Sequence, residues 1–169
     1  MSQSRSENPA ALAFNHIGVG VSDLESAVSW YTSVLGFRLI SGPVDTRSDG
    51  IEGRQAHNVL GARSRHMRQA HLTSGNGIGL ELFQLIDPPH ERRPDEIEYW
   101  RSGIFHFCVT GEDVPELVAR IKDAGGEQLS EIWPERNGET GYFMCYCRDP
   151  FGCVIEVYSH SYELVQGHR

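Results

Sequence analysis

The sequence predicts an α+β fold in which two paired βαβββ modules form a cupped mixed β-sheet around a metal site. Two observations support this prediction. Segments typical of strands and helices follow one another in the same order in both halves of the chain. Each half also begins with a histidine in a strand-like segment and ends with a glutamate in another.

Composition narrows the class of protein. A chain of 169 residues with 39% hydrophobic content can bury a core, as one compact domain or two tightly packed small modules. Its formal net charge of -8 and the lack of a basic run argue against a nucleic-acid partner. No apolar stretch is long enough for a signal-peptide core or a membrane span, so no membrane partner and a cytoplasmic location are expected.

The first half is predicted to consist of a polar, frayed leader over residues 1–12 and a first module over 13–87. Ser22 and Glu25 form the pattern of a capping box, and Gly36 ends the helix that follows. The stretch over 45–62 is expected to be a loop with a short helix. The predicted strands of this module are 14–21, 37–44, 65–73 and 78–86, the last two being a hairpin around Ser-Gly-Asn-Gly.

The second half repeats this order after a Pro-rich, charged linker over 88–102. The second module, over 103–160, is predicted to contain a strand at 103–110, a helix at 112–126 and a short strand at 127–133. A hairpin over 142–159 turns at Arg-Asp-Pro-Phe-Gly, which places Pro and Gly where a tight turn needs them. The tail over 161–169 is expected to lie on the surface.

The internal repeat brings four residues into equivalent positions. A shift of 90 residues aligns His16 with His106 and keeps the apolar positions of the two helices in register. A shift of 75 residues aligns Glu81 with Glu156 in the closing strands. The longer insert over 45–62 accounts for the difference between the two shifts.

Both glutamates are surrounded by apolar sequence, which makes them candidate ligands. A buried carboxylate without a partner costs several kcal/mol, so each needs a cation or a water-filled cavity. If the modules pack edge to edge, His16, Glu81, His106 and Glu156 converge on one point. Imidazole and carboxylate together suit one divalent ion such as Fe, Mn, Co, Ni or Zn. The remaining histidines are expected on the surface or in loops, with His66 and His71 as candidates to line the cavity.

Three segments resemble the vicinal oxygen chelate superfamily of glyoxalases, extradiol dioxygenases, methylmalonyl-CoA epimerases and antibiotic-resistance proteins. They are His16 in FNHIGVGVSDLESAVSWYTSVLGF, His106 in FHFCV and Glu156 in RDPFGCVIEVY. The resemblance covers residues 13–160 and implies paired modules, a divalent metal on those four ligands and substrates that chelate it through neighbouring oxygens. The chain differs from bacterial glyoxalase I after Glu81, where FQLIDPPH replaces an aromatic, Asn-Trp-Gly-like segment, and this argues against a glutathione substrate.

With four protein ligands, the expected activity is that of a glyoxalase-like isomerase, epimerase or lyase that stabilises an enediolate of a small substrate. Glu81 and Glu156 are both candidate bases, and the sequence does not rank them. The alternatives are an Fe(II) extradiol dioxygenase using His16, His106 and Glu156, and a metal-free drug-binding resistance protein. A homodimer is expected. The predicted substrate contacts are Phe83, Cys108 and Tyr158.

A group of arginines near the insert has two interpretations. On a solvated loop such residues usually form a charged face, and the alternative is a patch that binds a carboxylate or phosphate of the substrate. The arginines concerned are Arg54, Arg63, Arg65 and Arg68.

Overall fold

The computed structural model describes residues 10–138 and 140–167. Most of the predicted leader and the last two residues of the predicted tail therefore lie outside the described residues. Residues 10–12 are exposed and belong to no helix or strand.

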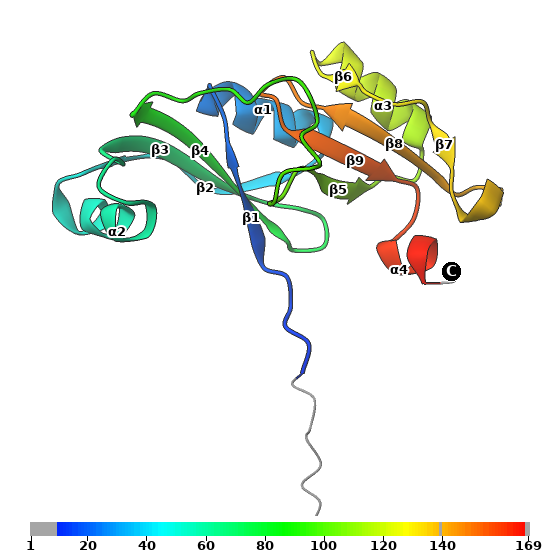
Figure 1. Cartoon of the computed structure of the whole chain (residues 1–169), viewed down its shortest axis with the longest axis horizontal. Helices are drawn as coiled ribbons and strands as arrows, with labels where there is room; N and C mark the ends of the chain where they lie inside the picture. Colours follow the sequence, from blue (N-terminus) through cyan, green and yellow to red (C-terminus); the bar gives the residue numbers. More distant parts are fainter. Residues whose placement is uncertain (1–9, 139, 168–169) are drawn as a thin grey trace, which may run out of the picture.

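The strands form two sheets, one from each half of the chain (Figure 1). The first sheet has the order β1-β4-β3-β2, and the second has the order β5-β9-β8-β6, with the short β7 also paired to β8. The α+β class and the repeated module predicted from the sequence are confirmed. The strands of the first sheet are β1 (His16–Gly20), β2 (Arg38–Arg47), β3 (His66–Thr73) and β4 (Gly79–Asp87). Those of the second are β5 (Phe107–Thr110), β6 (Glu127–Gln128), β7 (Trp133–Pro134), β8 (Phe143–Arg148) and β9 (Val154–Tyr158).

The first and last strands of each half pair in parallel, and their registers are equivalent. In the first sheet Gly18 of β1 lies opposite Glu81 of β4. In the second sheet Cys108 of β5 lies opposite Glu156 of β9. Each histidine therefore stands two residues before the residue that faces its glutamate.

Two helices cover the sheets, and their caps differ from the prediction at one point. Helix α1 (Leu24–Val34) begins after Asp23, whose Oδ1 accepts a hydrogen bond from the Ser26 amide at 2.8 Å. The predicted capping box of Ser22 and Glu25 is therefore wrong, because the carboxylate one residue later takes the N-cap position. Helix α3 (Val114–Asp123) has the equivalent cap at Asp113.

Two further helices extend the predicted pattern. The insert of the first half contains α2 (Gly50–Leu60), which fills most of the stretch predicted as a loop with a short helix. Helix α4 (Tyr162–Gln166) forms in the tail, and its Val165 is buried. The other described residues of the tail are exposed or half-buried, as expected for surface sequence, and Val165 is the residue that packs on the protein. A 3-10 turn, η1, spans Arg136–Gly138.

One continuous core joins the two halves. It includes Trp30 and Tyr31 of α1, and the Trp30 indole donates a hydrogen bond to the Ala124 carbonyl, 3.1 Å away at the end of α3. The Tyr31 hydroxyl donates to the buried Asp149 carboxylate, 2.6 Å away in the β8–β9 turn. Side chains of the first half are thus fixed by polar groups of the second. Among the described residues, no helix is long and apolar enough to cross a membrane.

Candidate metal centre

The first half of the candidate site is built on β1 and β4. His16 Nε2 lies 3.5 Å from Glu81 Oε2. Its Nδ1 is 2.7 Å from Asn15 Oδ1, and an amide oxygen only accepts, so the proton of the neutral ring is on Nδ1. The lone pair of Nε2 then faces a carboxylate oxygen. Two acceptors that face each other are held together when a cation lies between them.

Close contact between the two strands sets the position of His16. Gly79 lies opposite His16 in the register, and a Cβ on Gly79 would stand only 2.9 Å from the His16 Cβ. Glycine at this position lets the histidine backbone approach the edge of β4. The equivalent contact one step along the sheet is made by the Phe83 ring, which lies over Gly18.

His71 is a third polar residue in this half of the site. It lies directly opposite Glu81 in the antiparallel β3–β4 pair, and its Nδ1 is 3.3 Å from Glu81 Oε1. Of the two histidines considered as cavity residues, His71 is therefore beside the glutamate. His66 is at the far end of β3, where its Nε2 is 2.6 Å from Asp45.

The second half of the site has the same pair in a more buried setting. His106 Nε2 lies 3.2 Å from Glu156 Oε2, and the Glu156 side chain is only 8% exposed compared with 28% for Glu81. The sequence predicts His106 within a strand, but in the structure His106 directly precedes β5. Its Nδ1 is buried and has no hydrogen-bond partner among the described residues.

Tyrosines surround Glu156. Tyr146 lies opposite Glu156 in the β8–β9 pair. Burial, reinforced by the Glu156 carboxylate, raises the pKa of Tyr146, and the same two causes raise the pKa of Tyr158 to about 12. Both phenols therefore keep their protons at neutral pH. Of these two tyrosines, only Tyr158 is predicted from the sequence as a substrate contact. The position of Tyr146 opposite Glu156 follows from the register of the closing hairpin, which the sequence pattern leaves open.

The predicted substrate contacts lie around the two glutamates. Phe83 is half-buried and two residues beyond Glu81, so both side chains are on one face of β4. Cys108 is exposed and lies opposite Glu156. Tyr158 is buried and receives a hydrogen bond from the Gln166 amide at 3.1 Å.

Each histidine is beside its own glutamate, but one chain does not gather both pairs. In the part of the chain that the structure describes, no three or more His, Cys, Asp or Glu side chains are arranged to hold a metal ion. The short contacts, at 3.5 Å and 3.2 Å between an imidazole nitrogen and a carboxylate oxygen, lie within each pair. The two pairs are thus separate from each other, and each is a candidate half-site.

The donor set of each half-site fits a divalent ion. Two ligands about 2.1 Å from a metal and at right angles to each other are about 3 Å apart. The His–Glu separations of 3.5 Å and 3.2 Å are close to this spacing. Imidazole nitrogen with carboxylate oxygen is also a common ligand combination for Fe, Mn, Co, Ni and Zn.

Two of the arginines near the insert are neutralised by nearby acids. Arg65 Nε donates to Asp87 at 2.6 Å, and Arg68 donates to Glu25 at 2.9 Å. These contacts lower the pKa of both carboxyls, with the hydrogen bond as the largest cause. Arg65 and Arg68 therefore support the interpretation of a charged face on this side of the molecule.

Comparisons with known proteins agree with this architecture. A lactoylglutathione lyase of Arabidopsis thaliana is 23% identical over 144 residues, covering 85% of this chain, which spans 43% of that protein. An ethylmalonyl-CoA/methylmalonyl-CoA epimerase of Cereibacter sphaeroides is 26% identical over 145 residues, covering 85% of this chain and 94% of its own length. The crystal structure of a glyoxalase family protein from Bacillus cereus superposes with a TM-score of 0.72 at 23% identity, over 93% of this chain and 97% of that one.

The structural likeness concerns the fold, and the sequence match defines the family. Residues 13–157 match the family described as the glyoxalase/bleomycin resistance protein/dioxygenase superfamily. This stretch includes both His–Glu pairs and both sheets except for the last residue of β9. The chain belongs to the glyoxalase/bleomycin resistance protein/dioxygenase superfamily.

Proposed function

We propose that the protein is a divalent-metal-dependent isomerase, epimerase or lyase of the glyoxalase-like type. Its substrate is a small molecule with two neighbouring oxygens. The observation that carries the proposal is the paired geometry: at equivalent positions of two sheets, an imidazole Nε2 faces a glutamate oxygen at 3.5 Å and 3.2 Å. At His16 the tautomer leaves a lone pair facing that oxygen, which calls for a cation between them.

Each complete centre is proposed to form between two copies of the chain. His16 and Glu81 of one protomer meet His106 and Glu156 of its partner in a homodimer. The support is that the two pairs lie in separate sheets and do not form one group of ligands within the described part of a single chain. Exchange of modules between protomers uses the same edges that intramolecular pairing would use.

A divalent ion held there would supply Lewis-acid chemistry, stabilising the negative charge that develops on the two substrate oxygens as a proton leaves the carbon that carries one of them. The residues of the chain move that proton. One glutamate carboxylate accepts it and the other returns it, from the opposite side of the substrate. Tyr146 and Tyr158, which stay protonated beside Glu156, can donate hydrogen bonds to substrate oxygens.

Metal analysis tests the assignment. Protein purified without chelators is expected to contain one divalent ion per chain, and His106→Ala should lose most of it because a coordinating imidazole is removed. His66→Ala is the matched control, since His66 bonds to Asp45 away from both glutamates. Full metal content in folded His106→Ala protein would contradict the proposed centre.

A further inference from the structure

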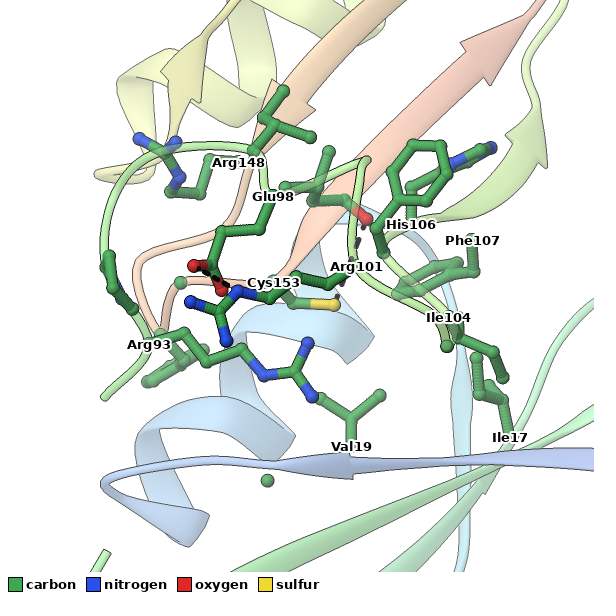
Figure 2. A pocket seen from close by; sticks show the side chains of 18 of the residues that line it. Ile17, Val19, Arg93, Glu98, Arg101, Ile104, His106, Phe107, Arg148 and Cys153 are labelled. Atoms are coloured by element: carbon green, nitrogen blue, oxygen red, sulfur yellow. Dashed lines mark hydrogen bonds and ion pairs between the residues drawn. The ribbon is translucent and has the colours of Figure 1, made fainter. Parts of the chain in front are cut away.

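A cavity of about 680 Å³ lies between the two halves of the chain (Figure 2). Its walls come from β1, from the segment that joins β4 to β5, and from the β8–β9 turn. The volume is within the range of roughly 300–1,000 Å³ that small-molecule sites occupy. The cavity can therefore hold a ligand of ordinary metabolite size.

One side of the cavity is apolar. Ile17 and Val19 of β1 lie on it together with Ile104 and Phe107 (Figure 2). Alternation along β1 directs these two β1 side chains to the face opposite His16. The apolar wall is thus distinct from the surface on which the first His–Glu pair lies.

On the opposite side of the cavity, arginines outnumber the acidic side chains. Figure 2 shows the side chains of Arg93 and Arg101 extending along the same side of the cavity. Arg101 pairs with Glu98 at 2.8 Å. No ion pair or hydrogen bond of the Arg93 guanidinium is found among the described residues, although Glu96 is on the same wall. Arg93 is therefore the charged group available to a ligand.

Arg148, a third arginine on the wall, is already satisfied. It is buried, and its guanidinium donates to Glu127 at 2.7 Å and to the Asp95 carbonyl. The bond to Asp95 holds the linker against β8, and the bond to Glu127 joins β8 to β6. They also give the cavity a fixed base, so that the exposed Arg93 can move without disturbing the wall.

We propose that this cavity is a second binding site for a small amphipathic anion, distinct from the His–Glu centre and next to it at His106. The carboxylate of the ligand contacts Arg93, and its hydrocarbon part lies against the apolar wall. A guanidinium binds a carboxylate through two parallel hydrogen bonds, which makes a lone arginine beside apolar surface selective for such a molecule. His106 is the one proposed metal ligand on the cavity wall, so a ligand in the cavity would lie next to one residue of the metal centre.

Calorimetric titration with decanoate, a simple amphipathic anion, tests the proposal. The parent protein is expected to bind decanoate, and Arg93→Gln should weaken binding roughly tenfold through loss of the charged hydrogen bonds. As a control, Arg54→Gln changes an exposed arginine on α2 and should leave the affinity for decanoate unchanged. Glu96→Gln removes from the same segment a negative charge, which repels decanoate. This variant should bind decanoate at least as tightly as the parent does. Equal loss of decanoate affinity in the Arg93 and Glu96 variants would show that either substitution disorders the linker, and this would overturn the proposed site.

Two further measurements separate this site from the metal centre. His16→Ala removes a proposed metal ligand that does not line the cavity, and decanoate binding should survive it. Loss of binding in His16→Ala would mean that decanoate binds the metal, and would overturn the second site while leaving the proposed enzyme intact. Decanol, which has the same chain without the charge, should bind at least tenfold more weakly than decanoate. Equal affinity for both would also overturn the proposal.

Discussion

The two half-sites have the same His–Glu pair in different surroundings. Glu81 is 28% exposed and has two imidazoles beside it, those of His16 and His71. Glu156 is 8% exposed and lies among tyrosines. The repeat thus conserves the geometry of the pair in both sheets but not its environment. A carboxylate with open space around it can rotate between a metal and a substrate, whereas a buried one is held in a single position.

This difference ranks the two glutamates, which the sequence alone did not do. If both glutamates serve the proposed centre, Glu156, which is restrained by burial, is expected to be the fixed ligand. Glu81, which is more exposed, is then expected to be the mobile base. The following predictions test this comparison and the way in which the two halves are brought together.

The largest effect is expected from combining two inactive chains. Alone, His16→Ala and His106→Ala proteins should each lack metal. When the two chains are co-expressed with different tags and the mixed dimer is isolated, one site in each dimer combines the intact first half of one chain with the intact second half of the other. About half an ion per chain should therefore return, measured by elemental analysis.

Complementation would fail if each chain held a complete centre, because every chain would then carry one mutated ligand. Light scattering on the parent protein gives an independent check. A monomer mass at micromolar concentration would rule out the dimer on which the shared centre depends.

Substitution of the glutamates should affect two measurements to different extents. Glu81→Gln and Glu156→Gln should each slow exchange of the C–H protons of hydroxyacetone with D₂O, under anaerobic conditions, by roughly 100-fold or more. Metal content should separate them: Glu156→Gln loses more metal, because it removes the buried, fixed ligand.

Equal metal loss in the two glutamine variants would contradict the ranking. Turnover that consumes O₂ with catechol, with Glu81→Gln nearly as active as the parent, would instead establish the dioxygenase alternative. In that case His16, His106 and Glu156 alone would hold the metal.

Sequence and structure agree best where a feature depends on local pattern. Alternation along predicted strands places Glu81 and Glu156 within apolar sequence, and the repeat selects His16 and His106 from eight histidines. Cross-strand neighbours depend on register instead. His71 faces Glu81, and Tyr146 faces Glu156, only after the hairpins are aligned residue by residue.

Other features are set by contacts distant in the sequence. Strand β2 runs to Arg47, beyond its predicted end, and pairs with β3 through irregular steps between Leu39 and Val44. Bulges of this kind leave little trace in hydrophobic periodicity. The cavity wall formed by the charged linker depends on the hydrogen bond between Arg148 and Asp95, which are 53 positions apart in the sequence. No local sequence pattern predicts this contact.

A moderate loss of stability is expected where the two halves are joined. Tyr31→Phe removes the hydroxyl that donates to the buried Asp149 carboxylate at 2.6 Å. The carboxylate keeps its bonds from the Phe151 and Cys153 amides but loses one donor, at a cost of about 1–3 kcal/mol in the free energy of unfolding. Urea denaturation measures this, with the exposed Tyr99→Phe as control. Equal stability of the two variants would show that this bond does little to join the halves.

The smallest effect is expected at Glu25, an exposed acid of the first half that contrasts with the buried Asp149. The Arg68 hydrogen bond lowers the pKa of Glu25, whereas burial raises the pKa of Asp149. A lowered pKa adds stability above the unfolded value of 4.5, and that contribution is lost as pH falls through the folded value. Glu25→Gln should therefore lower the free energy of unfolding by only about 0.5 kcal/mol at pH 7, because an exposed ion pair is screened by solvent. The difference from the parent, measured by urea denaturation, should shrink toward zero as the pH falls below 4.5 and through the lowered pKa of Glu25. It should also shrink in 1 M salt, where the screening length is about 3 Å. A difference that stayed constant with pH and salt would mean that packing of the Glu25 side chain, rather than its charge, stabilises this half.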